Sequence, residues 1–257
     1  MSKLLIGATG FVGGNLKDQI SFDDEVSSSN ISDAYNKSYE YVYCAAPQAA
    51  KWLANNDPKW DKSQVDDLIR SIKLMSFSNF ILISTVDVYE NLFNVDEDYK
   101  FSSKIIHHYG MNRRYLEHTL RDYLKEKLFI VRLPALVGKG LKKNIIYDLM
   151  NNNEIHKIDL NSTFQWYNIK FLSKDIERQL NLNIPLLNIS SEPLKTKELV
   201  NQFFKNYSIN SFSTSNNIAT SYNIKSKYSQ LWNSVGDYLY SSSNILENHI
   251  KPFILNK

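Results

Sequence analysis

The sequence predicts an α/β fold built on a doubly wound parallel sheet. Two observations predict it. Short apolar runs alternate with longer helical patterns through the first half of the chain, and a glycine-rich turn follows the first apolar run. A chain of 257 residues with 43% hydrophobic residues is long enough to bury the core of one large domain of this class.

The expected strands are apolar runs. They lie at 4–6 (LLI), 41–46 (YVYCAA), 80–85 (FILIST) and 128–134 (LFIVRLP), with a weaker run at about 25–28. Continuous apolar character is typical of parallel strands buried on both faces. A helix is expected to follow the glycine turn at residue 11, and another to carry Tyr109.

The pattern becomes less regular after Gly140. Residues 142–150 (KKNIIYDLM) look helical, 164–169 (FQWYNI) look like a strand with Trp166 in the core, and 191–204 look like the start of an amphipathic helix. The last twelve residues are read as a helix or a tail. Because no Pro/Gly-rich linker separates the halves, we expect a nucleotide-binding domain at 1–140 and a small C-terminal substrate lobe at 141–257 packed on it.

Composition excludes several classes of function. The 30 basic and 27 acidic residues are spread along the chain, so nucleic-acid binding is not indicated. The five histidines form no metal-ligand pattern, since the adjacent His107 and His108 would point to different faces of a helix. One cysteine, Cys44, excludes an intramolecular disulfide framework. With no long apolar run and no signal-peptide core, a soluble, cytoplasmic protein is expected.

The stretch GATGFVG places Gly7, Gly10 and Gly13 three residues apart, after a strand and at the start of a helix. Such a turn lets the backbone approach a pyrophosphate while the helix N-terminus offers unpaired amides. Dinucleotide binding is therefore favoured over a plain tight turn. The residues expected at the cofactor are Gly7, Thr9, Gly10, Phe11, Val12 and Gly13.

Three motifs in this order resemble the short-chain dehydrogenase/reductase superfamily. They are the glycine turn, the segment ISTVDVY and a Tyr-x-x-x-basic pattern, and they resemble in particular the extended branch of nucleotide-sugar epimerases, dehydratases and reductases. The resemblance spans residues 3–138 and implies a Rossmann-like fold and an NAD(P) cofactor. It also implies that Cys44, Ala45 and Ala46 pass under the cofactor, and that the segment 132–140, with Pro134 at the cofactor, leads into the substrate lobe.

The end of the second strand bears on the choice of dinucleotide. In dinucleotide-binding domains a carboxylate there commonly holds the ribose hydroxyls and disfavours a 2′-phosphate. Here Ser29 and Asn30 occupy that place, and both can donate hydrogen bonds to a phosphate. NADP is favoured over NAD, although no arginine is nearby and a polar strand end that decides nothing is the alternative.

The resemblance implies that Thr85 holds the substrate oxygen and that Tyr109 transfers the proton. Arg113 stands where the family has a lysine that holds the nicotinamide ribose and lowers the tyrosine pKa. A free tyrosine titrates near pH 10, so a neighbouring cation would favour its use at neutral pH. Arginine supplies that charge but cannot release a proton as an ammonium can. Arg114 is expected to point about 100° away and not to substitute.

A nucleotide-sugar substrate is expected beyond the carboxyl ends of the strands. Dehydration is less favoured than reduction or epimerisation, because the family's Asp-Glu pair is not evident in TVDVYE. The substrate contacts expected are Ser84, Tyr89, Lys143, Asn144, Gln165 and Tyr167.

Two functions therefore stay open. One is an NAD(P)-dependent reductase or epimerase of nucleotide sugars, supplying polysaccharide biosynthesis. The other is a non-catalytic dinucleotide-binding regulatory or scaffold protein in which Arg113 marks lost chemistry. A homodimer is left open as well.

Overall fold

The fold is described from a computed structural model, which describes residues 1–102, 107–213, 219–232, 234 and 236–255. The chain divides into two compact units. Unit 1 comprises Met1–Glu90, Lys100–Leu133 and Lys170–Leu187, and unit 2 comprises Asn91–Tyr99, Pro134–Ile169 and Asn188–Lys257. The chain thus crosses between the units repeatedly, whereas the sequence suggested one boundary at residue 140.

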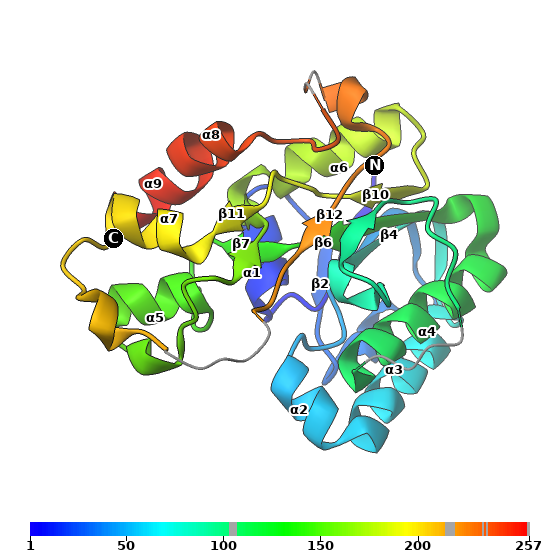
Figure 1. The fold of residues 1–257 in the computed structure, drawn as a ribbon. Coiled ribbons are helices and arrows are strands. Elements are labelled where there is room, and N and C mark those ends of the chain that lie inside the picture. The colour runs from blue at the N-terminus through cyan, green and yellow to red at the C-terminus, as the bar shows by residue number, and fades with distance from the viewer. Residues whose placement is uncertain (103–106, 214–218, 233, 235, 256–257) are drawn as a thin grey trace. The chain divides into compact units, whose positions relative to one another are not determined.

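Unit 1 is built on a parallel sheet, as predicted (Figure 1). In the described part of the chain, six strands lie in the order β10-β6-β4-β3-β1-β2. They are β1 (Lys3–Ile6), β2 (Asp24–Val26), β3 (Ser38–Cys44), β4 (Ser76–Thr85), β6 (Leu128–Leu133) and β10 (Leu186–Asn188). Strand β1 lies between β2 and β3, so that Leu4 pairs with Asp24 of β2 on one side and with Val42 of β3 on the other.

The helices of unit 1 are α1 (Phe11–Lys17), α2 (Lys51–Asn56), α3 (Pro58–Ile72), α4 (His108–Leu124) and α6 (Leu172–Asn181). The long helices α3 and α4 pack side by side (Figure 1). Their apolar residues, such as Leu68 and Leu116, share one core with Val42 and Leu82 of the sheet. Since neighbouring strand residues point to opposite faces, Tyr43 faces the other side, where Glu177 of α6 lies near its hydroxyl.

Unit 2 has short strands and helices around its own core. The strands are β5 (Phe93–Val95), β7 (Ala135–Val137), β8 (Thr163–Phe164), β9 (Trp166–Asn168), β11 (Leu194–Lys195) and β12 (Asn223–Ile224). The helices are α5 (Ile145–Asn151), α7 (Thr196–Phe203), α8 (Ser242–Asn244), a π-helical turn at Ile245–Ile250 and α9 (Lys251–Leu255). Trp166 is 2% exposed in this core, which confirms its predicted place.

Candidate active site

The order of the sheet strands reverses between β1 and β3, which is where ligands of doubly wound sheets bind. The loop after β1 and the loop after β3 meet there. Gly7 has a φ of +87°, and its N–H donates to the carbonyl oxygen of Val26 over 2.8 Å. A Cβ on Gly7 would lie 2.8 Å from the carbonyl oxygen of Ala45. Only glycine permits both this backbone conformation and this contact between the loops.

The start of α1 lies against the same loop. A Cβ on Gly13 would lie 2.1 Å from the carbonyl oxygen of Gly7, so glycine lets the helix begin directly above the turn. Thr9 and Gly10 are exposed, while Phe11 and Val12 are half-buried. The first N–H groups of a helix have no intrahelical partner. The predicted glycine cradle is therefore present as a geometry that fits a pyrophosphate, with amides at its mouth.

The loop after β2 places a carboxylate where the sequence suggested none. Asn30 accepts hydrogen bonds from the N–H and the hydroxyl of Ser27, at 2.8 and 3.0 Å, and its amide nitrogen donates to Asp33 over 3.3 Å. Ser29 is exposed and shares a hydrogen bond with Ser27. An added phosphate at Asn30 would meet the charge of Asp33, which weakens the case for NADP over NAD.

The Cys44 side chain does not face a ligand. It is fully buried in the core at the end of β3, and burial raises the pKa of its thiol to about 12. Within 44–46, it is the backbone of Ala45 that borders the glycine loop, with its N–H donating to the Ile6 carbonyl over 2.8 Å. Ala45 and Ala46 are half-buried.

Thr85 ends β4 and caps the short 3-10 helix η2 (Val86–Val88). Its hydroxyl oxygen accepts the N–H of Asp87 over 3.1 Å, so the hydroxyl hydrogen is left to donate elsewhere. Asp87 in turn accepts from the Lys51 ammonium at 3.0 Å and lies 3.8 Å from Nε2 of His107.

Tyr109 lies in the first turn of α4, next to this group. Its N–H donates to the side chain of Asn55 over 3.0 Å, and the residue is only 7% exposed. Burial raises the pKa of its phenol to about 12; Arg113 opposes the rise, while the negative charges of Asp87 and Asp61 add to it. The net lowering expected from the Tyr-x-x-x-Arg pattern is therefore not present in this structure.

Arg113 is held by residues that the sequence did not connect to it. Its guanidinium lies over the Tyr109 ring, 4.7 Å from the centroid, but forms two hydrogen bonds with the Asp61 carboxylate at 3.0 and 3.1 Å. It also donates to the carbonyl oxygen of Gln48 over 2.9 Å. Arg113 is 5% exposed and Asp61 2%. The cation is thus paired with an equally buried anion, whose charge opposes part of the effect of Arg113 on the pKa of the phenol.

Two predicted substrate contacts in unit 1 have other roles. The hydroxyl of Ser84 donates to Glu117 over 2.6 Å, and Glu117 forms a buried ion pair with Arg132 at 2.5 Å. Tyr89 is 2% exposed, under the Arg132 guanidinium at 4.7 Å. The expected substrate contacts through these side chains are corrected to a buried network that joins α4 to β4 and β6.

The neighbouring Arg114 instead pairs with Glu90 at 2.6 Å. This confirms that it turns away from Tyr109, on a different face of α4 from Arg113.

The remaining predicted contacts lie in unit 2, together with Pro134. Gln165 is 2% exposed and bonds through both ends of its amide to backbone groups of Ser191 and Ile224. Tyr167 is fully buried against the rings of Tyr240 and His249. Both side chains are therefore structural, because no polar or ring surface of theirs is left for a ligand.

Lys143 and Asn144 precede α5. Lys143 is exposed, and partial burial of its ammonium lowers its pKa. Asn144 caps α5 by accepting the Tyr147 N–H over 3.0 Å, and its amide nitrogen donates to the Leu136 carbonyl at 2.8 Å. Its φ of +131° is a strained conformation for a residue with a Cβ. Of these two, Lys143 is the one whose side chain reaches solvent.

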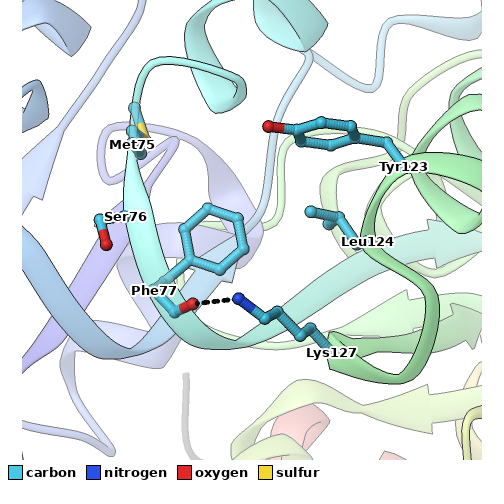
Figure 2. A pocket seen from close by; sticks show the side chains of 6 residues that line it. All are labelled: Met75, Ser76, Phe77, Tyr123, Leu124 and Lys127. Atoms are coloured by element: carbon cyan, nitrogen blue, oxygen red, sulfur yellow. Dashed lines mark hydrogen bonds between the residues drawn. The ribbon is translucent and has the colours of Figure 1, made fainter.

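A surface cavity of about 290 Å³ lies at the far end of β4 from Thr85 (Figure 2). Residues at the start of β4 and at the end of α4 line this cavity. The Lys127 ammonium donates to the Phe77 carbonyl over 3.2 Å (Figure 2). No predicted site residue lines it. Its lining residues are Met75, Ser76, Phe77, Tyr123, Leu124 and Lys127.

The described residues contain no group of three or more His, Cys, Asp or Glu side chains placed to hold a metal ion. No helix among them is both long and apolar enough to cross a membrane.

The sequence matches no protein-family model and no curated protein. Solved structures do match over the full fold. The chain shares its α/β fold with these structures. It matches dTDP-4-dehydrorhamnose reductase from Bacillus anthracis in complex with NADP at a TM-score of 0.75, with 15% identity, over 100% of this chain and 99% of that one.

A second match is UDP-N-acetylglucosamine 4-epimerase from Methanobrevibacter ruminantium in complex with UDP-N-acetylmuramic acid. The TM-score is 0.74 with 11% identity, over 99% of this chain and 97% of that one. A third, MoeE5 in complex with UDP-glucose and NAD, matches at 0.67 with 16% identity, over 93% of both chains. At these identities the likeness confirms the fold that the motifs implied.

Sequence reasoning missed the partners of the motif residues. Asp61 lies 52 positions before Arg113, and Lys51 lies 36 positions before Asp87, so no local spacing relates them. Asp87 stands inside the quoted segment ISTVDVY and His107 comes two residues before Tyr109, and only the fold shows that they meet.

Proposed function

We propose that the chain is a NAD(P)-dependent oxidoreductase, a reductase or epimerase, that acts on a nucleotide-activated sugar in the supply of polysaccharide precursors. One observation carries the proposal. The glycine cradle, the Thr85 hydroxyl and the Tyr109 phenol all belong to unit 1, and the cradle and Thr85 lie at the carboxyl ends of its parallel strands. Ligands of such sheets bind at that edge.

The cradle fits a dinucleotide because its glycines place no side chain between the turn and the start of α1. The N–H groups at the start of α1 would hold the diphosphate, with Gly7 and Gly10 allowing close approach. Asn30 and Asp33 stand where the adenosine ribose would be held. When bound, the nicotinamide would supply or take up the hydride. The choice between NAD and NADP then depends on Asp33.

Two residues would act on the sugar itself. Thr85 can donate its hydroxyl hydrogen to the substrate oxygen, since its lone pair already accepts the Asp87 N–H. Tyr109 would give a proton to that oxygen in reduction and take it in oxidation. Arg113 and Asp61 hold the ring of Tyr109 from one face as a neutral pair, so they orient the phenol more than they acidify it.

The nucleotide-sugar substrate is inferred from the matched structures, whose names include UDP-sugars and a dTDP-sugar reductase. The second candidate function, a non-catalytic dinucleotide binder, is favoured by one observation. Arg113 is bonded to Asp61 and Gln48, and burial raises the pKa of Tyr109 to about 12 although Arg113 opposes the rise. In that case the glycine cradle would bind the dinucleotide, and the Tyr109 phenol would transfer no proton.

A Tyr109→Phe variant separates these functions. Purified protein is first assayed for NADH and NADPH binding by fluorescence, then for hydride transfer with a panel of UDP- and dTDP-4-keto sugars. Removal of the phenolic proton should lower kcat about 100-fold or more, while the dinucleotide Kd stays within about twofold. Tyr115→Phe, on the exposed side of the same helix, is the matched control and should keep full activity.

Equal activity of Tyr109→Phe and wild type would exclude the catalytic role. Binding of dinucleotide without any hydride transfer over the panel would support the binder. Failure of wild-type protein to bind either dinucleotide would contradict both functions.

A further inference from the structure

A reductase consumes one proton per turnover. Arg113 cannot supply a new proton to Tyr109. Its guanidinium stays protonated at all accessible pH values and is bonded to both Asp61 oxygens and to the Gln48 carbonyl. Tyr109 itself is 7% exposed. After it gives up its proton, the phenolate therefore needs another group that can carry a proton in from water.

Helix α2 presents such a group toward the first turn of α4. Lys51 and Asn55 are four residues apart on α2 and so lie on one face. Asn55 accepts the N–H of Tyr109 over 3.0 Å, which shows that this face is turned to the start of α4. The Lys51 ammonium on the same face bonds to Asp87 at 3.0 Å, two residues after Thr85.

The exposure of these side chains rises from the interior outward. The Asp87 side chain is 14% exposed and the Lys51 side chain 42%. Lys51 thus bonds to Asp87, whose charge acts on the Tyr109 phenol, and is also in contact with bulk water. An ammonium, unlike a guanidinium, can release a proton and take one up again.

In the described part of the chain, the other titratable groups around Asp87 are His107, His108 and the Arg113–Asp61 pair. His107 lies 3.8 Å from Asp87, and its ring is stacked on the Tyr109 ring at 6.2 Å. Its Nδ1 accepts the Gly110 N–H over 3.0 Å, and burial, together with Lys51 and His108, lowers its pKa, so it is neutral at pH 7. The Arg113–Asp61 pair is neutral as a whole. Among these described residues, Lys51 is the ammonium that bonds to Asp87 and also reaches water.

We propose that Lys51 is a further catalytic residue, the ammonium that returns the proton to Tyr109, with Asp87 holding it in place. The inference rests on the proposed function. In reduction a C–H bond forms from the hydride of the reduced dinucleotide, and the phenol O–H breaks as the new sugar O–H forms. A Lys51 N–H then breaks as the phenol O–H re-forms, across a bridging water where the two do not touch. The amine regains its proton from bulk water.

The proposal also bears on the reaction. An epimerase returns the phenolic proton to the sugar within each turnover, so it needs no net supply. A proton route at Lys51 is useful to a reductase, and the inference therefore favours net reduction.

Chemical rescue tests the proposal. Lys51→Ala and Lys51→Arg are assayed for kcat with NADPH or NADH and the best substrate of the 4-keto sugar panel, with and without added ethylamine or methylamine. Lys62→Ala and Lys62→Arg are the matched controls, because Lys62 is an equally exposed lysine paired with Asp66 at 2.8 Å on α3. Near-UV circular dichroism and the dinucleotide Kd verify that each variant is folded and binds.

We expect both Lys51 variants to lose at least about tenfold in kcat with an unchanged dinucleotide Kd. Added amines should restore the kcat of Lys51→Ala, and a more basic amine should restore more of it. Added guanidinium should not restore kcat. Full kcat in Lys51→Arg, or a Lys51→Ala defect that amines leave unchanged, would overturn the proposal. In those outcomes wild-type activity stands, whereas an inactive wild type would count against the proposed function instead.

Discussion

Asp33 is a single side chain that should set the choice of dinucleotide. It lies 3.3 Å from the Asn30 amide, in the segment after β2 where the adenosine ribose is expected. Asp33→Asn removes its charge, so the affinity for NADPH should rise about fivefold to tenfold relative to NADH, as expected for roughly 1 kcal/mol of repulsion at an exposed site. Titration of both reduced dinucleotides by fluorescence measures the ratio.

Asp66→Asn on α3 is the control for Asp33→Asn, because it removes a half-buried carboxylate far along the sequence from β2. An unchanged NADPH-to-NADH ratio in Asp33→Asn would show that the carboxylate does not meet the ribose.

His107 should make stability depend on pH. Its folded-state pKa is lowered, mainly by burial and by Lys51, so the unfolded chain binds the proton more tightly. The stability that it contributes is complete above the ordinary histidine pKa, near 6.5, and is lost as the pH falls through the lowered folded pKa. In His107→Asn the amide oxygen can still cap Gly110, but nothing titrates.

Urea unfolding at several pH values between 7 and 5 tests this prediction. The wild-type free energy of unfolding should fall relative to that of His107→Asn as the pH is lowered, and the loss should begin near pH 6.5. A parallel pH dependence in the two proteins would exclude His107 as the source.

At the scale of an element, the start of α1 is defined by its distance from the glycine loop. A Cβ on Gly13 would lie 2.1 Å from the Gly7 carbonyl oxygen, while a Cβ on Gly14 would meet nothing within 4 Å. Gly13→Ala should therefore displace α1, abolish dinucleotide binding and cost about 2 kcal/mol or more of stability. Gly14→Ala is the matched control and should stabilise the helix by about 0.5–1 kcal/mol.

Both substitutions are measured by thermal unfolding and by dinucleotide titration. Normal binding in Gly13→Ala would mean that the cradle does not depend on the close approach of α1 to the turn.

The elements were more predictable from sequence than their partners. Strands β1, β3, β4 and β6 coincide with apolar runs, since a parallel strand buried on both faces needs continuous apolar residues. The helix of Tyr109 was predicted as well. The ion pair of Arg113 was not predicted, because its partner Asp61 comes from α3 and the contact exists only once α3 and α4 pack together.

The same reason explains the substrate contacts in unit 2 that were corrected. Gln165 and Tyr167 have side chains suited to binding a sugar, yet one satisfies backbone groups and the other fills the core. Residue type and strand position alone cannot distinguish a buried polar group that serves the fold from one that serves a ligand.

At the scale of the whole molecule, the two units are interleaved along the chain. Segments 91–99 and 134–169 belong to unit 2, but the chain on both sides of each segment belongs to unit 1. While unit 1 is folded, it fixes both ends of each segment. Closing loops of these lengths costs about 2 and about 3 kcal/mol of chain entropy, so unit 2 loses that much stability when unit 1 unfolds. A chain with one boundary at residue 140 would have no such coupling.

The interleaved connection predicts that the units unfold together. Differential scanning calorimetry should show one transition in which the calorimetric and van't Hoff enthalpies agree. NADPH or NADH at about 100 times its Kd should stabilise the protein by about 2.7 kcal/mol and move the whole transition upward, although the glycine cradle lies in unit 1 alone. Two separate peaks, of which the dinucleotide shifts one, would show that the unit 2 segments hold their fold without the anchoring of their ends.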